Sequence, residues 1–337
     1  MDVSTIGVDL AKSVFQCHGV NSAGETVLRK RLRRSEVLQF FGRLKPCLIG
    51  SEACASAHYW ARELRALGHT VRLIPPAYVK AHAHRGKSDA IDAAAICAAV
   101  LSPNTRFVPI KTAEQQASLS LHRIRQQLIS QRTCNINVLR AQMAEFGLIA
   151  KAGPKHVDAL VAIVKDEADI RLPAQARVAL RETVATLEHL DLRIKTIDKA
   201  INEAHKADAT SQRLATQPCV GPIMATAFVA SVPDPQHFRS ARHFAASLGL
   251  TPKNRSSGGK ERLGKISKMG DRYLRMLLVL GATSRLAQAK RYRRPQDAWI
   301  LRLLARRPAR VVITAIANKM ARVMWVLLAR GETYRPA

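Results

Sequence analysis

The chain has 337 residues, of which 54 are Lys or Arg and only 25 are Asp or Glu, so its formal net charge is +29. A positive charge of this size indicates polyanionic partners such as DNA or RNA. An aromatic content of 5% argues against serial base stacking as the main binding mode. No apolar run approaches the ~20 residues of a spanning helix, and the first residues lack the pattern of a signal peptide. We therefore expect no membrane partner.

Residues 1–105 are predicted to fold as an α/β domain of the ribonuclease-H type. Three short strands come first, joined by turns rich in Asn, Ser and Gly, and helices then alternate with strands. A plain doubly wound sheet would lack this opening three-stranded meander. The expected elements are strands Ser4–Asp9, Val14–Val20 and Glu25–Leu32, a helix over 35–44, strand Leu48–Glu52, helix Ala57–Leu67 and strand Thr70–Ile74.

Residues 106–208 are predicted to be helical and extended, with breaks at Pro154 and Pro173. Five apolar residues in this region keep a 3-4-3-4 spacing that suits the seam of a coiled coil. An ordinary helical hairpin packed on itself has the same pattern, so both structures stay open. Either one would serve as a spacer or an oligomerisation arm. The seam residues are Leu187, Leu190, Ile194, Ile197 and Ile201.

Residues 209–337 are predicted to form a second, mainly α-helical domain that ends in an apolar helix from Ala309 to Leu328. The stretch from Pro218 to Pro222, with Gly221 inside it, resembles the turn of a helix-hairpin-helix element. Glycine in such a turn lets backbone N–H groups approach a phosphate. The same residues also fit an ordinary turn.

Four carboxylates occupy positions that a metal site would use. Asp9 and Glu52 follow apolar runs that read as strands, and Asp89 and Asp92 lie three residues apart at the start of an alanine-rich stretch that reads as a helix. In a ribonuclease-H-like fold these elements meet at one edge of the sheet. Clustered carboxylates repel each other unless cations neutralise them. Two Mg²⁺ or Mn²⁺ ions, about 4 Å apart, could then promote attack on a phosphodiester.

The segment from Thr251 to Arg275 carries a second group of candidate residues. A Ser-Ser-Gly-Gly core (Ser256 to Gly259) lies among cations, an arrangement that allows close approach of the backbone to phosphate. It is either a basic loop that grips nucleic acid or the site of a serine nucleophile. The cations are Lys253, Arg255, Lys260, Arg262, Lys265, Lys268, Arg272 and Arg275.

Several motifs together resemble the DEDD transposases of bacterial insertion sequences, in the IS110 family and its IS1111 branch. The N-terminal ones are Gly7-Val8-Asp9-Leu10-Ala11-Lys12, Glu52-Ala53-Cys54-Ala55, His58-Tyr59-Trp60-Ala61-Arg62 and the run from Arg85 to Ala93. The C-terminal ones are the stretch from Pro218 to Pro222, the stretch from Phe244 to Pro252 and Ser256-Ser257-Gly258-Gly259. The wider family often has Ala-Thr-Gly after the second carboxylate, where this chain has Ala53-Cys54-Ala55.

The resemblance implies a RuvC-like catalytic domain, a coiled-coil linker and a C-terminal transposase domain. It implies that Asp9, Glu52, Asp89 and Asp92 bind the metal and that Ser257 forms a transient phosphoserine link to DNA. Ser256 stays open as an alternative to Ser257. Arg85, Lys87, Gly221 and the cations of the segment Thr251 to Arg275 are the candidate nucleic-acid contacts.

The function implied is site-specific DNA recombination at donor and target DNA, guided by a non-coding RNA called a bridge or seeker RNA. The partners would include further copies of the chain, as a dimer or tetramer, in a bacterial cytoplasm on nucleoid DNA. Three alternatives stay open: a metal-dependent endonuclease like a Holliday-junction resolvase, a nucleic-acid-binding protein without catalysis, and a sugar-kinase-like fold, which shares the opening strand and Asp but would not need this charge.

Overall fold

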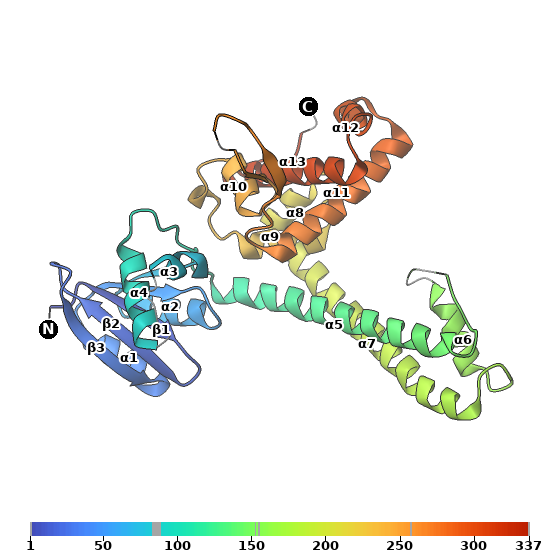
Figure 1. The fold of residues 1–337 in the computed structure, drawn as a ribbon, viewed down its shortest axis with the longest axis horizontal. Helices are drawn as coiled ribbons and strands as arrows, with labels where there is room; N and C mark the ends of the chain where they lie inside the picture. Colours follow the sequence, from blue (N-terminus) through green and yellow to red (C-terminus); the bar gives the residue numbers. More distant parts are fainter. Residues whose placement is uncertain (1, 83–88, 152, 154–155, 257, 336–337) are drawn as a thin grey trace. The chain divides into compact units, whose positions relative to one another are not determined.

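A computed structural model describes residues 2–82, 89–151, 153, 156–256 and 258–335 (Figure 1). The chain forms two compact units: residues 1–116 with 231–237, and residues 117–230 with 238–337. Each is described by itself. Three of the candidate residues, Arg85, Lys87 and Ser257, lie outside the described residues.

The first unit is built on a five-stranded mixed sheet in the order β3-β2-β1-β4-β5. β1 pairs antiparallel with β2 and parallel with β4; β2 and β3 are antiparallel, and β4 and β5 are parallel. The mixed α/β character predicted from the sequence is confirmed. The strands are β1 (Thr5–Leu10), β2 (Val14–Val20), β3 (Thr26–Arg33), β4 (Leu48–Glu52) and β5 (Thr70–Ile74).

Helices cover both faces of this sheet, and each face has its own apolar core. On one face, α1 (Val37–Gly42) and α2 (Ala57–Ala66) bury Phe41 and Trp60, and Trp60 meets Phe15 edge to face at 5.0 Å. On the other face lie α3 (Pro76–His82) and α4 (Asp89–Leu101), whose core is a separate cluster. The helix predicted over 35–44 begins instead as a 3₁₀ turn, Arg34–Glu36, because the Glu36 carboxylate accepts the Arg33 N–H at 2.8 Å.

Two glycines let α4 lie almost on the backbone of the sheet. A Cβ atom at Gly7 in β1 would stand 2.3 Å from the carbonyl oxygen of Ala93 and 2.4 Å from the backbone nitrogen of Cys97. A Cβ atom at Gly50 in β4 would stand 2.7 Å from Cβ of Val100. Such separations are impossible for real side chains, so α4 can occupy this position only over glycine.

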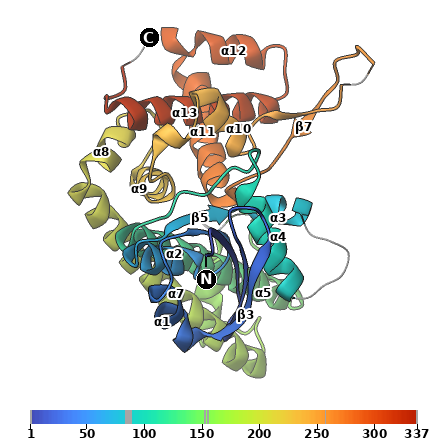
Figure 2. The ribbon, with the colours of Figure 1, turned by 90° about the vertical axis from the view of Figure 1, so that its left-hand side faces the viewer.

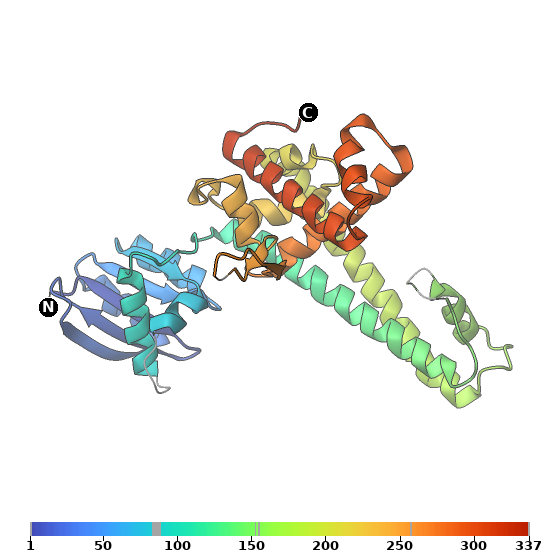
Figure 3. The same ribbon diagram turned by 45° about the horizontal axis from the view of Figure 1, so that its top comes forward.

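In the second unit, two long helices run side by side in opposite directions, α5 (Ala113–Ala144) and α7 (Ala174–Ala207) (Figures 1 and 3). Arg132 of α5 pairs with Asp191 of α7 at 2.8 Å. The predicted seam therefore packs against α5 of the same chain, with Leu190 and Ile194 in one cluster with Leu128. A coiled coil that links copies of the chain stays a prediction. The short α6 (Asp158–Lys165) packs on α7, which begins after Pro173.

The rest of the second unit is mostly helical. Apart from the two-stranded hairpin of β6 (Pro252–Asn254) and β7 (Leu263–Ile266), it contains α8 (Ala209–Ala215), α9 (Pro222–Ser231), α10 (Ala241–Ser247), α11 (Arg272–Tyr292), α12 (Ala298–Leu304) and α13 (Ala309–Arg330). By length and composition α13 could cross a membrane, contrary to the expectation from the sequence. It packs instead against α8, α10, α11 and α12, with Ile316 and Met324 buried. We therefore assign it to the core of this unit.

A buried histidine joins α5 to two helices of the same unit. Nδ1 of His122 lies 3.0 Å from the Tyr273 hydroxyl on α11, and Nε2 lies 3.1 Å from Oγ1 of Thr226 on α9. Because Thr226 donates its own proton to the Pro222 carbonyl at 2.7 Å, Nε2 must be the protonated nitrogen and Nδ1 the acceptor. Burial, together with the nearby Arg125 charge, lowers the pKa of His122 to about 4.

This histidine predicts a pH dependence of stability. The folded pKa lies below the ordinary value of 6.5, so the unfolded chain binds the proton more tightly. Stability is therefore full above pH 6.5 and falls as the pH drops towards 4, by up to about 3 kcal/mol. We expect urea unfolding to show this loss in the wild-type protein and a shallower loss in His122→Leu. Equal slopes in the two proteins would contradict the assignment.

Candidate active site

The first candidate site lies where two neighbouring parallel strands end. Asp9 is the fifth residue of β1, and Glu52 is the last residue of β4. The register pairs Val8 with Ser51, so the two acidic residues follow at adjacent positions. The sheet therefore brings together two residues that lie far apart in the sequence, Asp9 and Glu52.

Alternation along the strands decides the face on which the two carboxylates lie. Side chains two residues apart in a strand share a face, so Asp9 lies on the face of Gly7 and Glu52 on the face of Gly50. That is the face on which α4 packs. The helix runs antiparallel to β1, since Ala93 lies over Gly7 while the later Cys97 reaches the carbonyl of Thr5 at the start of the strand. Its first turn therefore carries Asp89 and Asp92 towards the end of β1.

The four carboxylates interact electrostatically. The pKa of Asp9 rises from 3.8 to about 6, first because the group is partly buried and then because Asp92, Asp89 and Glu52 repel its negative charge. The pKa of Glu52 is also raised, by burial and then by Asp92. A fold that holds four acids together at this cost is typical of a functional site.

These residues suit a divalent cation by donor type and charge. Carboxylate oxygens are the ligands that Mg²⁺ and Mn²⁺ prefer, and a bound cation would relieve the repulsion that raises the pKa of Asp9. Within the described part of the chain, no group of three or more His, Cys, Asp or Glu side chains is gathered closely enough to coordinate an ion. The roles of the four residues as ligands therefore stay predictions.

The sequence reasoning missed Gly7 and Gly50, which position α4. A signal was present: each strand acid follows a glycine by two residues, as Gly7-Val8-Asp9 and Gly50-Ser51-Glu52.

The second candidate site is the basic hairpin, which extends from the helices of its unit (Figure 2). Its base is fixed by close packing at two glycines in left-handed conformation. Gly270 has φ +69, and a Cβ there would meet the Ser247 carbonyl oxygen at 1.9 Å; Gly249 has φ +70 and lies against Met269. Backbone bonds from Ser267 to Thr251 (2.9 Å) and from Lys268 to Gly249 (3.2 Å) complete the base.

Ser256 has a structural role in this hairpin. Its hydroxyl accepts the Arg262 N–H at 3.0 Å, and its own N–H donates to the Asn254 side chain at 2.8 Å. The backbone N–H of Arg255 donates to the Arg262 carbonyl at 2.9 Å. These bonds close the loop on both sides of the Ser-Ser-Gly-Gly core, where Gly258 and Gly259 have φ of +57 and +74.

The predicted nucleic-acid contacts do not all have the same surroundings. Most of the hairpin cations, from Lys253 to Lys268, are exposed, and Arg272 is exposed in the first turn of α11. Arg275 is half-buried, and its Nη1 donates to the carbonyls of Leu248 (2.9 Å) and Met269 (2.7 Å). It therefore holds the hairpin base. Gly221 is exposed directly before α9, and a Cβ added there would have no neighbour within 4 Å.

Comparison with known proteins identifies the family. The profile of the IS116/IS110/IS902 transposase family matches residues 211–296, and the profile of the DEDD transposases of IS110 type matches residues 6–147. A probable family 20 transposase of Pseudomonas aeruginosa is 48% identical over 100% of both chains. The chain belongs to the IS116/IS110/IS902 transposase family. The transposase for insertion sequence element IS1111A of Coxiella burnetii is 36% identical, covering 99% of this chain and 92% of its own. The transposase for element IS1328 of Yersinia enterocolitica is 35% identical over 99% of both.

Family membership confirms the transposase assignment made from the motifs. The protein is a transposase of insertion sequences, and its family catalyses DNA cleavage and strand transfer. A divalent cation is implied by the DEDD family. The alternative of a nucleic-acid-binding protein without catalysis is therefore not retained.

Proposed function

We propose that this transposase cuts and rejoins DNA through a phosphoserine intermediate, with Asp9, Glu52, Asp89 and Asp92 as ligands of Mg²⁺ or Mn²⁺ and Ser257 as nucleophile. A non-coding guide RNA pairs with donor and target DNA and supplies the sequence choice. The first unit is RuvC-like, and the chain acts as a dimer or tetramer. The observation that carries this proposal is the electrostatic coupling of the four acids on the α4 face of β1 and β4.

The excess of positive charge supports two polyanionic partners. Most of the formal charge of +29 lies in the second unit, where the hairpin carries exposed cations on both of its strands. Base pairing would select the DNA sequence, so the protein needs mainly to grip backbones, and Lys and Arg do this without reading bases.

The hydrogen bonds of Ser256 favour its neighbour as the nucleophile. The Ser256 hydroxyl is engaged in closing the loop, so we assign the nucleophile to Ser257, the other serine of the core. The glycines that follow allow the approach of a phosphate, and nearby Lys and Arg side chains would stabilise the charge that develops on it.

The reaction proposed has two balanced steps. In the first, a bond forms from Ser257 Oγ to phosphorus while a bond from phosphorus to a DNA oxygen breaks; the serine loses its proton and the leaving oxygen gains one. In the second, a DNA hydroxyl of the partner duplex attacks the phosphoserine and releases the serine. When bound, the cations would supply charge neutralisation at the scissile phosphate. The four acidic residues hold them, and the hairpin presents the phosphate to the serine.

The test is capture of the covalent intermediate. Labelled element-end DNA is incubated with Mg²⁺ and the RNA that co-purifies with the protein, and the products are denatured and separated. We expect a labelled protein–DNA adduct with wild-type protein and with Ser256→Ala, and no adduct with Ser257→Ala or without RNA.

Different outcomes exclude different parts of the proposal. Cleavage that persists in Ser257→Ala without an adduct would indicate a resolvase-like endonuclease instead. Adduct formation independent of RNA would exclude guidance.

A further inference from the structure

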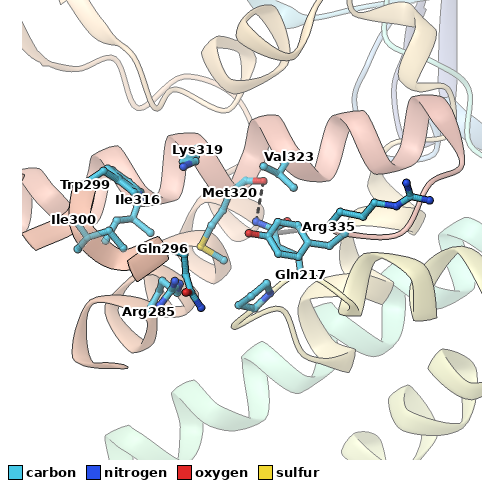
Figure 4. Close-up of a pocket in the computed structure, with 12 residues that line it drawn as sticks. Gln217, Arg285, Gln296, Trp299, Ile300, Ile316, Lys319, Met320, Val323 and Arg335 are labelled. Atoms are coloured by element: carbon cyan, nitrogen blue, oxygen red, sulfur yellow. Dashed lines mark hydrogen bonds between the residues drawn. The ribbon is translucent and has the colours of Figure 1, made fainter. Parts of the chain in front are cut away.

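The second unit contains a small pocket beneath α13 that the proposed chemistry does not use. Its volume is about 210 Å³. Figure 4 shows Gln217 below the helix, with Met320 and Lys319 on α13 and Trp299 on α12. Tyr334 also lines it, and the Tyr334 N–H donates to Thr216 Oγ1 at 2.9 Å, which fixes the chain end at this wall.

Gln217 places an unused acceptor in the wall of the pocket. The residue is only 5% exposed, and its Nε2 points to the Met320 carbonyl at 3.5 Å. The amide orientation is assigned from this contact, because the opposite orientation would set two oxygens against each other. Among the described residues Oε1 has no hydrogen-bond partner although it is buried. A buried acceptor without a donor costs free energy, which a ligand N–H would recover.

The wall of the pocket carries no net charge, and positive side chains lie at its margin. Arg285 pairs with Asp297, which is 0% exposed, so the charge of this wall is cancelled. Lys319 and Arg335 are exposed at the margin. A nucleotide has the complementary pattern, because its base is flat and uncharged and its phosphate is anionic.

A basic groove adjoins the pocket and shares two of its residues, Trp299 and Lys319, whose ammonium lies 4.5 Å from the centre of the Trp299 ring. The groove has a volume of about 1000 Å³ and runs between the hairpin and α13. Its further cations are Lys265, Lys268, Arg310 and Arg322, and none of the described residues that line it is acidic.

We propose that the pocket takes one unpaired nucleobase of a strand whose phosphates lie along this groove. A lone base turned out of its stack is recognised in this way, by an aromatic or apolar wall and hydrogen bonds to its edge. The Gln217 Oε1 accepts an N–H of the base, Trp299 and Tyr334 contact its ring, and Lys319 holds the adjacent phosphate. The strand is DNA or RNA, since both carry this chemistry.

The test measures binding of full-length protein, in EDTA, to three fluorescein-labelled probes of one sequence: single-stranded DNA, single-stranded RNA and blunt duplex DNA. Gln217→Leu and Trp299→Leu should each raise the Kd for the preferred single strand about tenfold and change the duplex Kd by less than about twofold. Lys319→Gln should weaken all three probes. Lys290→Gln removes the same charge from the exposed end of α11 and should leave all three unchanged.

Two further results decide the proposal. An iodouracil-substituted single strand should photocrosslink to Trp299 or Tyr334, and the tighter single strand identifies the source as DNA or RNA. Single-strand binding unchanged in Gln217→Leu, or single-strand and duplex binding weakened equally, would overturn it. Gln217→Leu should unfold at no lower urea concentration than wild type, because it removes an unsatisfied oxygen.

This inference rests on the proposed function in that the partner is a nucleic acid, but binding is measured without cleavage. If no phosphoserine adduct forms, the proposal for the pocket is unaffected. If Gln217→Leu does not weaken single-strand binding, the proposal of phosphoserine chemistry is unaffected.

Discussion

Asp9→Asn is expected to lower DNA cleavage on the order of 1,000-fold and, at the same time, to stabilise the metal-free protein. The activity falls because one proposed ligand of the cations is lost where charge develops on the phosphate. In the wild type, the negative charge of Asp9 destabilises the folded protein, as its pKa of about 6 against an ordinary 3.8 shows. The variant has no such charge and is therefore more stable. The wild type therefore loses stability as the pH rises from 4 through 6. The amide avoids this loss.

The gain above pH 6 should be about 1–2 kcal/mol, after allowance for solvent around the half-buried group. Urea unfolding in EDTA at pH 8 measures it, and Mg²⁺ should then stabilise the wild type but not the variant. The matched control is Asp2→Asn, which removes the same charge at an exposed position of the same unit. If Asp9→Asn were less stable than wild type in EDTA, the electrostatic account would be wrong.

Gly7→Ala is expected to destabilise the first unit by about 3 kcal/mol and to lower cleavage about 100-fold even where the protein remains folded. The new methyl group would stand 2.3 Å and 2.4 Å from two backbone atoms of α4. Backbone cannot turn aside as a flexible side chain can, so the helix must move and carry Asp89 and Asp92 with it.

Gly42→Ala is the control for this effect. Gly42 ends α1 in the same unit, and a Cβ there has only Leu67 Cδ2 near it, at 3.8 Å. Alanine suits a helix better than glycine, so this variant should be as stable as wild type or up to about 1 kcal/mol more stable. The comparison uses urea unfolding and strand cleavage. Equal stability of the two variants would mean that α4 is not held in this way.

The local elements could be predicted because their signals are local. Val14–Val20, Leu48–Glu52 and Thr70–Ile74 begin and end at the expected residues, since alternating apolar residues stop at clear turn residues. The start of the helix after β3 was missed because the Arg33 N–H donates to the Glu36 carboxylate and a 3₁₀ turn forms first. Partners across the chain were not predictable in this way: the spacing of the α7 seam identifies an apolar stripe but not the helix that covers it.

The acidic residues of the candidate site could be predicted from the sequence, but the glycines that position α4 could not. Asp9, Glu52, Asp89 and Asp92 stand out because acids are few in this chain and because these four lie at the ends of apolar strands or at the start of an alanine-rich helix. The contacts of Gly7 and Gly50 depend on which helix crosses the strands, and that is a property of the fold. The hydrogen bond of Ser256 to Arg262 likewise depends on how the loop closes, so spacing alone could not separate Ser256 from Ser257.

The glycines below α4 have a consequence for reading genomes. Copies of insertion sequences accumulate substitutions once selection on them ends, and the four proposed metal ligands are not the only positions at which such a change would matter. A copy that keeps all four acids but has exchanged Gly7 or Gly50 for a larger residue has lost the support of the site, because α4 can no longer reach the strands. These two glycines therefore belong among the markers that separate functional copies from relics.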